Sequence, residues 1–504
     1  MITEPPFQRI GDLVRAHAAA RPEAPAITVS GHSLNWAELA ARANRVAASL
    51  QRDGLRPGQA IAIVSFSNTD YVALYLGALM AGVAVAPMPP SATPEQLQAM
   101  VADSGAPLLF LDAANAQALS HLDFGARRIG IEALDDWLSG EQPALLAVDD
   151  ETLLAMPFNI IYSSGTTGVP KGIIHSWRMR WSHLVGGAAV GYGPDSVALL
   201  ATPLYSNTTL VAALPALAWG GHLLLMPKFD AQGFLQLAQD ARATHSMLVP
   251  VQYRRIMDLP DFDRFDLSSY RLKLCTSAPF PAELKAEVLK RWPGGLIEYW
   301  GMTEGGGGTV LVAHAFPDKL HTIGQPFPGT EILIVKDDGT EAQTGEVGEM
   351  IGFSDATMSG YANRPEATEA ARWRHPDGRI FIRTGDLARR DADGFIELVG
   401  RAKDMIISGG FNIYPIDIEQ VLAEHPHVKD AAVVGIPSRA WGESPVAFVV
   451  APGAEPEALR QWANERLGKV QRLAALQLTD ELPRSAIGKI LKRELRDRWQ
   501  GEIP

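Results

Sequence analysis

The sequence has little cysteine and no excess of positive charge. Cys275 is its single cysteine among 504 residues, which excludes a disulfide within the chain and a cysteine-rich metal site. The 45 Lys and Arg residues are outnumbered by 57 Asp and Glu, and the net charge of −12 argues against a nucleic-acid-binding protein. One cysteine is typical of a reducing compartment, so we expect a cytoplasmic protein without nucleic-acid partners.

The chain also lacks an apolar run suited to a membrane. Residues 71–94 and 196–227 are uncharged and exceed the roughly 20 residues that span a bilayer. Prolines close the first stretch, while prolines and four consecutive polar residues (206–209) interrupt the second. Lipid-exposed helices tolerate such breaks poorly, so both are predicted to be buried core. The start, MITEPPFQRI, lacks the basic and apolar regions of a secretory signal.

Apolar segments of strand length alternate with helical patterns. Residues 60–66 are predicted as a buried strand, 71–82 as a helix and 83–88 as the next strand of a βαβ unit. The same alternation follows in later segments and favours parallel sheets covered by helices. The fold class is therefore α/β. We expect a large N-terminal domain of parallel-rich sheets, with a small β-barrel-like part.

The sequence pattern changes in the C-terminal part of the chain. Short segments with Asp-Gly or Gly punctuation, typical of hairpins, occupy 330–400. After residue 404 the pattern is strand, helix, strand, strand, helix, which predicts a small α+β domain. We place the boundary at Lys403, with domains at 1–402 and 404–504.

The most informative segment is FNIIYSSGTTGVPKG, residues 158–172. Glycines free the backbone N–H groups to converge on an anion, hydroxyls add donors, and a lysine adds charge. The segment is not the common P-loop, because its lysine follows Pro170 and precedes Gly172. A polar turn between a strand and a helix is the alternative, but the density of these residues favours a nucleoside triphosphate site. Its candidates are Ser163, Ser164, Gly165, Thr166, Thr167, Gly168 and Lys171.

Five ordered motifs carry a family resemblance over essentially the whole chain. They are YSSGTTGVPKG (162–172), YWGMTE (299–304), RTGD (383–386), GRAKDMIISGGFNIYPIDIE (400–419) and PRSAIGKI (483–490). Together they resemble the adenylate-forming superfamily of acyl-CoA synthetases, nonribosomal adenylation domains and beetle luciferases. The resemblance implies an AMP-forming acid–thiol ligase. Such an enzyme converts a carboxylic acid and ATP into an acyl-adenylate and pyrophosphate, then transfers the acyl group to coenzyme A and releases AMP.

The resemblance also implies the nucleotide contacts. Loop 163–172 would cradle the β- and γ-phosphates, Thr303 would meet the α-phosphate, and Glu304 would help to hold Mg²⁺, which prefers oxygen ligands. Trp300 stands where the family usually has Tyr, so it keeps the stacking on adenine and loses a hydroxyl. Asp386 would accept both ribose hydroxyls. The remaining ATP-binding candidates are Ser277, Ala278, Pro279, Tyr299, Gly301 and Arg401.

Lys489 matches the lysine that bridges the substrate carboxylate and the α-phosphate; the alternative is an exposed lysine on an amphipathic helix. Lys403 matches the hinge about which the C-terminal domain swings between the half-reactions. Gly409 and Gly410 would then border the pantetheine channel. Trp441 matches a position that often contacts CoA, although a packed tryptophan is nearly as good an interpretation.

The acyl pocket is the least defined part of the prediction. Ser206 stands where many relatives carry His, and Asn207 either bonds the substrate or satisfies its own backbone. The glycines at 305–308 remove bulk and suggest room for an aromatic, alicyclic or medium-chain fatty acid. Arg255 either meets a second carboxylate or is an ordinary surface arginine. The pocket candidates are Tyr205, Ser206, Asn207, Thr276, Gly305, Gly306 and Gly307.

Three functions remain open at this point. The first is a CoA ligase for a hydrophobic organic acid, acting as a monomer or homodimer on small molecules. The second is a stand-alone enzyme that loads a carrier protein, although no carrier domain is attached. The third is a non-catalytic nucleotide-binding regulator, which would have no need of Lys489, Glu304 and Asp386.

Overall fold

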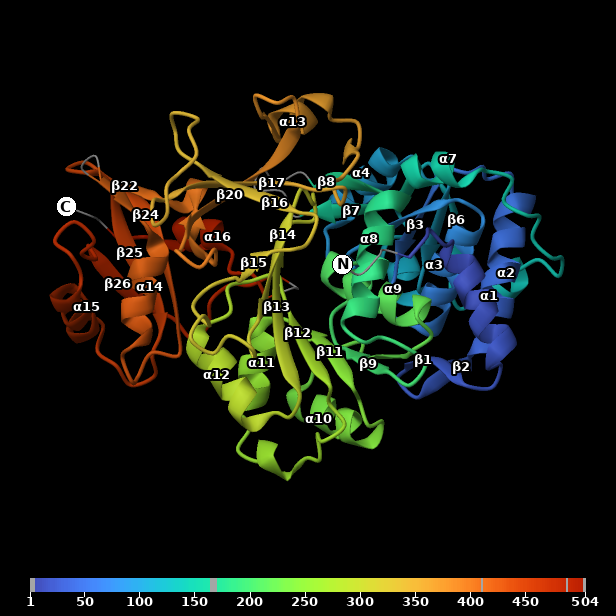
Figure 1. Cartoon of the computed structure of the whole chain (residues 1–504), viewed down its shortest axis with the longest axis horizontal. Coiled ribbons are helices and arrows are strands. Elements are labelled where there is room, and N and C mark those ends of the chain that lie inside the picture. Colours follow the sequence, from blue (N-terminus) through green and yellow to red (C-terminus); the bar gives the residue numbers. More distant parts are fainter. Residues whose placement is uncertain (1–4, 164–169, 409–410, 486–487, 502–504) are drawn as a thin grey trace. The chain divides into compact units, whose positions relative to one another are not determined.

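The structure is a computed structural model that describes residues 5–163, 170–408, 411–485 and 488–501. It contains two compact units (Figure 1). The first comprises Met1–Leu320, Pro326–Glu331 and Gly352–Ile382, and the second comprises His321–Gln325, Ile332–Ile351 and Arg383–Pro504. The second unit thus includes residues on both sides of Lys403, and the domain boundary expected there stays a prediction.

A nine-stranded sheet has the order β15-β14-β13-β12-β11-β9-β10-β1-β2. Its six strands from β13 to β1 are parallel, while β2 and β14 pair in the antiparallel sense. The strands are β1 (Pro25–Val29), β2 (His32–Asn35), β9 (Val197–Leu200), β10 (His222–Leu225), β11 (His245–Leu248), β12 (Leu272–Cys275), β13 (Gly295–Gly301), β14 (Gly308–Val312) and β15 (Gln325–Pro326).

A seven-stranded sheet of the first unit has the order β18-β8-β7-β4-β3-β5-β6. The strands from β7 to β6 are parallel, and β8 turns back antiparallel to β7. The expected βαβ unit is confirmed, because β3 and β4 pair in parallel on either side of helix α3. The strands are β3 (Ala60–Val64), β4 (Ala84–Met88), β5 (Leu108–Leu111), β6 (Arg127–Gly130), β7 (Pro157–Ser163), β8 (Lys171–Ser176) and β18 (Gly360–Tyr361).

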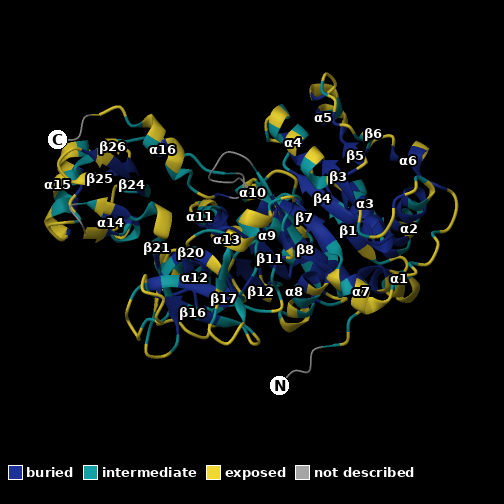
Figure 2. Cartoon of the chain, turned by 90° about the horizontal axis from the view of Figure 1, so that it is seen from above, coloured by how far each residue is buried: buried dark blue, intermediate teal, exposed yellow. Residues whose placement is uncertain are grey.

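Helices connect these strands and cover the sheets. Their buried faces meet strands that are almost fully buried, as Figure 2 shows for β3, β4 and β7. The helices are α1 (Ile10–Ala20), α2 (Trp36–Arg52), α3 (Thr69–Met80), α4 (Pro94–Ser104), α5 (Ala113–Ala118), α6 (Leu134–Trp137), α7 (Asp150–Ala155), α8 (Trp177–Ala189), α9 (Asn207–Ala218), α10 (Ala231–Asp240), α11 (Pro250–Met257), α12 (Ala282–Arg291) and α13 (Pro365–Ala370), with a 3-10 turn at Phe262–Arg264.

Smaller sheets follow in the chain. One has the order β16-β17-β20-β19 with β21 paired to β20, and the other has the order β23-β22-β25-β24 with β26 paired to β25. The second of these carries the strand and helix pattern predicted after residue 404. The elements are β16 (Glu331–Val335), β17 (Gly348–Phe353), β19 (Arg372–Arg374), β20 (Ile380–Arg390), β21 (Ile396–Arg401), a 3-10 turn (Ala402–Asp404), β22 (Ile406–Ser408), β23 (Phe411–Ile413), α14 (Pro415–Ala423), β24 (Asp430–Ser438), β25 (Gly442–Val450), α15 (Pro456–Arg466), β26 (Ala475–Leu478) and α16 (Lys492–Arg498).

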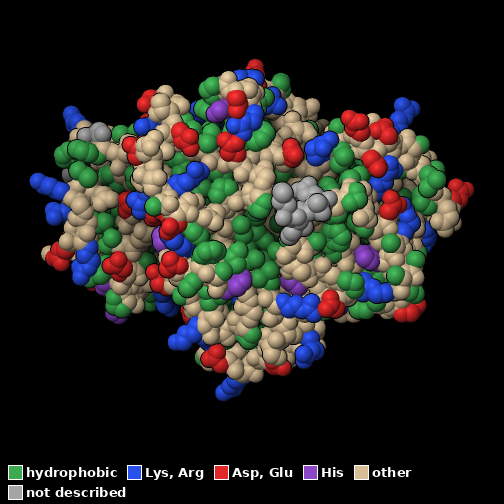
Figure 3. All heavy atoms as spheres, viewed as in Figure 1, with side chains coloured by type: hydrophobic (Ala, Val, Ile, Leu, Met, Phe, Trp, Pro, Cys, Tyr) green, Lys and Arg blue, Asp and Glu red, His purple; other side chains and the backbone are tan. Residues whose placement is uncertain are grey.

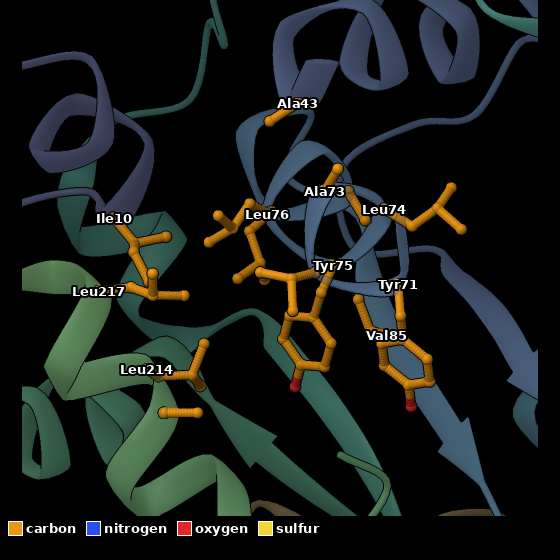
Figure 4. Packing of buried hydrophobic residues seen from close by; sticks show 14 of the residues in the cluster. Ile10, Ala43, Tyr71, Ala73, Leu74, Tyr75, Leu76, Val85, Leu214 and Leu217 are labelled. Atoms are coloured by element: carbon orange, nitrogen blue, oxygen red, sulfur yellow. The ribbon is translucent and has the colours of Figure 1, made fainter. Parts of the chain in front are cut away.

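The core of the first unit surrounds α3, which is buried from Tyr71 to Met80. Because α3 is apolar on all sides, it packs against α2, α1 and strand residues at once. Figure 4 shows Tyr71, Leu74, Tyr75 and Leu76 leaving this helix toward different neighbours. The uncharged stretches are thus core segments, and no helix among the described residues is long and apolar enough to cross a membrane.

Charged side chains stay outside this core for the most part. On the face drawn in Figure 3, acidic and basic side chains alternate over the surface, and neither sign dominates a broad area of that face. This mixed pattern agrees with a composition in which 45 basic residues stand against 57 acidic ones.

Gly77 permits the close approach of α3 to α2. A Cβ atom at this position would lie 2.5 Å from Cβ of Val46 and 2.6 Å from the carbonyl oxygen of Ala43. Gly77→Ala should therefore destabilise the protein by about 1–3 kcal/mol through overpacking. Gly186→Ala is the matched control, since it also lies in a helix but faces open space, and it should be neutral or slightly stabilising. Urea unfolding measures both, and equal midpoints would contradict this account of the α2–α3 contact.

Candidate functional site

The carboxyl ends of parallel strands assemble the predicted motifs at one sheet edge. β9, β11, β12 and β13 are neighbours in the nine-stranded sheet and run in the same direction. The segments that follow β9, β12 and β13 therefore leave the sheet at the same edge, where α/β proteins bind ligands. These segments are 201–209, 276–279 and 302–308, which contain most of the predicted pocket residues.

The predicted phosphate loop connects two antiparallel strands. Ser163, the last residue of β7, pairs with Lys171, the first residue of β8, so the alternative of a strand-to-helix turn is wrong. Lys171 lies with its Nζ atom 5.1 Å from the centre of the Tyr361 ring, a cation–π contact. The side chain of Ser163 and the predicted residues Ser164, Gly165, Thr166, Thr167 and Gly168 lie outside the described residues.

Tyr361 links this lysine to the predicted metal ligand. Its hydroxyl donates a hydrogen bond of 2.8 Å to Oε1 of Glu304. Burial and the negative charge of Glu304 raise the pKa of Tyr361, so the hydroxyl stays protonated and remains a donor. Sequence reasoning did not identify Tyr361, which is 190 positions from Lys171 and belongs to no recognised motif. The contacts of Tyr361 with Lys171 and Glu304 arise only when the folded chain brings these distant segments together.

A buried histidine forms a hydrogen bond with the backbone of the YWGMTE motif. His175 is fully buried, and its Nε2 atom lies 2.7 Å from the carbonyl oxygen of Thr303. Burial and the charge of Arg180 lower the pKa of His175 well below its usual value, so the ring is neutral and Nε2 carries the proton. In the same motif, Tyr299 and Trp300 are half-buried and Gly301 is exposed.

The segment after β12 contacts the predicted acyl pocket. Ser277 has a φ of 82°, a left-handed conformation that is uncommon for a residue with a side chain. Its hydroxyl lies 2.6 Å from that of Thr208 at the start of α9. Thr276 and Ala278 are half-buried beside it, and Pro279 is exposed.

The three predicted pocket residues at the start of α9 have distinct roles in the structure. Ser206 is buried and caps α9, accepting a hydrogen bond of 3.3 Å from the N–H group of Thr208. Asn207 does not bond its own backbone through Oδ1, which instead accepts a hydrogen bond of 2.8 Å from Nη2 of Arg180. Tyr205 is half-buried, and burial raises the pKa of its hydroxyl.

The glycines after Glu304 do not provide open space. A Cβ atom at Gly305 would lie 1.9 Å from the carbonyl oxygen of Ala356, and at Gly306 one would lie 2.5 Å from Cβ of Ile382. At Gly308 the ring of Phe327 would be 2.7 Å away. The expectation of room at these three positions is wrong: neighbouring chain already fills it, and Gly305 and Gly306 also have positive φ. That Gly305, Gly306 and Gly307 border the acyl group stays a prediction.

Arg255 lies on α11 with its side chain exposed, and no ion pair is found for it among the described residues. The interpretation as an ordinary surface arginine is therefore favoured over a pocket residue.

The second unit groups several charges around Asp386. This carboxylate is nearly buried in β20 and forms an ion pair of 2.6 Å with Nε of Arg401, which follows from the pairing of β20 with β21. Lys489 lies near enough to respond to both residues. Lys489 is exposed as a whole residue, but desolvation of its ammonium and the positive charges of Arg401 and Lys403 lower its pKa. The pKa of Lys403 is also lowered, by burial and by Arg401 against the opposing charge of Asp404.

Lys489 precedes α16 and does not belong to it, so the alternative of a lysine on an amphipathic helix is wrong about the helix, although Lys489 is exposed as that alternative expects. Its backbone is fixed to Ser485, whose N–H group donates to the carbonyl oxygen of Lys489 at 2.8 Å.

The predicted CoA residues are only partly described. Gly409 and Gly410 lie outside the described residues. Trp441 is 60% exposed, which contradicts the alternative of a packed tryptophan. Phe411 and Ile407 are also more than half exposed, and both belong to the β22–β23 hairpin that leads to and from the two glycines.

No cluster of three or more His, Cys, Asp or Glu side chains suited to a metal is found within the described ranges. Glu304 offers one carboxylate, whose Oε1 atom is bonded to Tyr361.

Comparisons with known proteins identify the family of this chain. Residues 14–362 match the AMP-binding enzyme family, and residues 417–489 match the AMP-binding enzyme C-terminal domain. A feruloyl-CoA synthase of Amycolatopsis sp is 34% identical over 98% of this chain and 99% of its own. A fatty acid–acyl-carrier-protein ligase of Streptomyces coeruleorubidus is 30% identical over 99% and 98%. ATP-bound MatB from Rhodopseudomonas palustris matches with a TM-score of 0.87 at 28% identity, over 97% of this chain and 98% of that one.

The packing around Gly305 leads to a test. Gly305→Ala must displace the backbone of Ala356, and we expect a loss of at least about 2–3 kcal/mol in the free energy of unfolding. Gly329→Ala is the matched control, because Gly329 has a similar φ of 78° but no atom near its missing Cβ. It should lose only about 1 kcal/mol from the backbone conformation. Thermal unfolding measures the difference. A Gly305→Ala protein as stable as the control would restore the interpretation of open space.

Proposed function

Because this chain belongs to the AMP-binding enzyme family, whose adenylate-forming members include AMP-forming acid–CoA ligases, we propose that it joins a hydrophobic carboxylic acid to coenzyme A. The acid first attacks the α-phosphorus of ATP, so that an acyl-adenylate forms and pyrophosphate leaves. The thiol of CoA then attacks the acyl carbon, so that a thioester forms and AMP leaves. The observation that carries the proposal is the grouping of Lys489, Arg401 and Lys403 with Asp386 in the second unit.

Lys489 stabilises the first step electrostatically. Attack on the α-phosphorus brings a carboxylate to a phosphate that is already negative, and charge builds on the phosphoryl oxygens. A fixed ammonium lowers the energy of that arrangement more than that of the separated reactants. No protein nucleophile is required, since AMP is itself the leaving group of the second step.

Asp386 binds the ribose of ATP. A carboxylate accepts hydrogen bonds from two neighbouring hydroxyls, and the ion pair with Arg401 fixes its orientation. Because Asp386 is nearly buried, its bond to the ribose is shielded from water and contributes more than an exposed one would.

Residues of the first unit hold the phosphates. Loop 163–172 supplies N–H groups and the charge of Lys171, and Thr303 meets the α-phosphate. Trp300 stacks on the adenine from the end of β13. Tyr361 holds one oxygen of Glu304.

Glu304 fits a Mg²⁺ site that the nucleotide completes. Mg²⁺ is commonly bound by one or two carboxylates together with substrate phosphates and water, so a single carboxylate that is linked through Tyr361 to Lys171 suffices. When bound, the ion neutralises phosphate charge. Glu304 supplies the protein's carboxylate, and Tyr361 orients it.

The thiol step uses the C-terminal residues 404–504, which turn about Lys403. Gly409 and Gly410 admit the pantetheine arm past a backbone without side chains. Trp441 and Phe411, both exposed, offer apolar surface to the cofactor.

For the acid we propose an aromatic, alicyclic or medium-chain fatty acid, taken up beside Tyr205, Ser206, Asn207 and Thr276. The feruloyl-CoA synthase supports an aromatic acid by its name. Transfer to a carrier protein is the second candidate, and the carrier-protein ligase among the relatives favours it. Free CoA should consume the acyl-adenylate under the first proposal and leave it unchanged under the second.

Lys489 should serve the first half-reaction alone. Lys489→Ala should reduce acid-dependent pyrophosphate release by about 10²–10³, because one preorganised charge is lost. Given synthetic acyl-adenylate and CoA, the same variant should form thioester at close to the wild-type rate. Lys469→Ala, an exposed lysine of the same unit, is the control for loss of charge. An equal fall in both half-reactions would show that Lys489 supports the fold and not adenylation.

Asp386→Ala should raise the KM for ATP by about tenfold or more, since a buried acceptor for the ribose is removed. The KM for the acid should change far less. Asp337→Ala, an exposed aspartate in a turn of the second unit, provides the control. Steady-state pyrophosphate release at varied ATP measures both, and an unchanged KM for ATP would remove Asp386 from the nucleotide site.

A further inference from the structure

Arg180 is a buried cation close to the predicted acyl pocket. It lies on α8 and is only 1% exposed. Its Nη2 atom donates to Oδ1 of Asn207, which follows the pocket residues Tyr205 and Ser206. The charge of Arg180 also acts on His175, whose ring bonds the carbonyl oxygen of Thr303 in the YWGMTE motif. Arg180 is therefore bonded to one segment that leaves the sheet at the site edge, and its charge reaches a residue that contacts a second such segment.

The partners of Arg180 are all neutral. Nε donates to Oδ1 of Asn159 at 2.8 Å, Nη2 donates to Asn207 at 2.8 Å, and Nη1 approaches Nδ1 of His183 at 3.4 Å. Burial and the charge of Arg180 lower the pKa of His183 to about 3, so that ring is an acceptor and carries no charge. No carboxylate within the described ranges forms an ion pair with Arg180. Burial lowers the pKa of Arg180 to about 10, so it is still positive at neutral pH.

Other buried cations of the first unit are neutralised or fully bonded. Lys285 forms an ion pair of 2.5 Å with Glu298. Lys273 donates to the carbonyl oxygens of Trp292, Pro293 and Gly294, which uses all three of its N–H bonds. A guanidinium has five donors, and only three of those on Arg180 have partners among the described residues. A buried charge without an opposite charge is unfavourable, and the other two buried cations among the described residues of this unit are compensated. The uncompensated charge of Arg180 therefore indicates a function other than stability.

Neighbouring polar atoms lack partners as well. The amide nitrogen of Asn159 and the hydroxyl of Tyr75 are buried and bond to no described residue. Burial raises the pKa of Tyr75 against the opposing charge of Arg180, which places the hydroxyl close to the cation. Figure 4 shows the hydroxyl of Tyr75 pointing away from α3, alongside that of Tyr71. Both tyrosines also line a small cavity with Leu204, Leu210 and Leu214. Among these buried atoms the unpartnered donors outnumber the unpartnered acceptor, which is Nδ1 of the neutral His175 ring.

Such a donor set matches an oxyanion. A carboxylate has about four acceptor positions and one negative charge, which is what the N–H groups of Arg180 and Asn159 and the hydroxyl of Tyr75 lack. Asn207 is the half-buried partner of Arg180, so its displacement gives a ligand access to the enclosed guanidinium.

We propose that the acid ligated by this enzyme carries a second acidic group, which binds to Arg180. This inference rests on the proposed function and narrows its substrate class to diacids. Arg180 is then the residue that selects a diacid over a monocarboxylic acid of the same length, by pairing with the end that does not react.

The test compares matched acids in pyrophosphate release. The pairs are adipate with hexanoate, suberate with octanoate and terephthalate with benzoate. Wild-type protein should give at least a tenfold higher kcat/KM for the diacid of one pair or more. Arg180→Met should lose about 10²–10³ of kcat/KM on that diacid, since a buried charge pair is broken, while the matched monoacid is unchanged or improved. Arg178→Met, an exposed arginine two positions earlier on α8, should behave as wild type.

Stability separates recognition from a structural role. Replacement of an uncompensated buried charge by an apolar side chain is often neutral or stabilising, so Arg180→Met should unfold at the same temperature or higher. A lower unfolding temperature together with equal losses on both acids of a pair would overturn the inference. A wild-type preference for the monoacid in every pair would do so without any variant. If no acid of the panel released pyrophosphate, the proposed function would fail and this inference with it.

Discussion

Parallel pairing of buried strands is the constraint on which the rest of the site depends. Strands β9, β11 and β12 have nearly all of their side chains in the core, β13 pairs with β12 at their side, and the backbone groups of the buried strands are satisfied by neighbouring strands. Pairing in one direction forces every segment that follows a strand to leave at the same edge. Segments that are up to about a hundred positions apart in the sequence are thereby brought to the same edge of the sheet, where their polar residues face one region. No local sequence feature of any single motif specifies this proximity.

The sequence predicted those parts of the fold and site that depend on local pattern. The strand predicted at 60–66, the helix predicted at 71–82 and the strand predicted at 83–88 each follow from periodicity, and the structure confirms them as β3, α3 and β4 with β3 and β4 paired in parallel. Lys171, Asp386 and Arg401 were selected as site candidates from motifs, while the place of Lys171 at the start of β8 and the pairing of Asp386 with Arg401 were seen only in the structure. In each of these cases the residue type and its immediate neighbours carry the information.

Residues fixed by contacts between distant segments could not be found in this way. Tyr361 joins Lys171 to Glu304 although neither is near it in the sequence, and His175 bonds a carbonyl oxygen, which any residue can offer. The glycines were misread for a related reason. A missing side chain is visible in the sequence, but the atom that occupies its place is not, and at Gly305 that atom is the carbonyl oxygen of Ala356. Ser206 stands where many relatives carry His. The structure gives a reason for serine at this position, because its side chain caps α9.

The buried donors around Arg180 bear on how an enzyme of this kind distinguishes acids. A hydrophobic pocket separates substrates that differ by one methylene only weakly, because the difference in buried surface is small. A pocket with unpaired buried donors discriminates far more strongly, since an acid without the matching oxyanion leaves those donors desolvated and unbonded. The discrimination therefore comes from the penalty on the wrong acid as much as from attraction to the right one. Placing the charge on α8, a helix of the core, holds it in position before the acid arrives and reduces the entropy lost on binding.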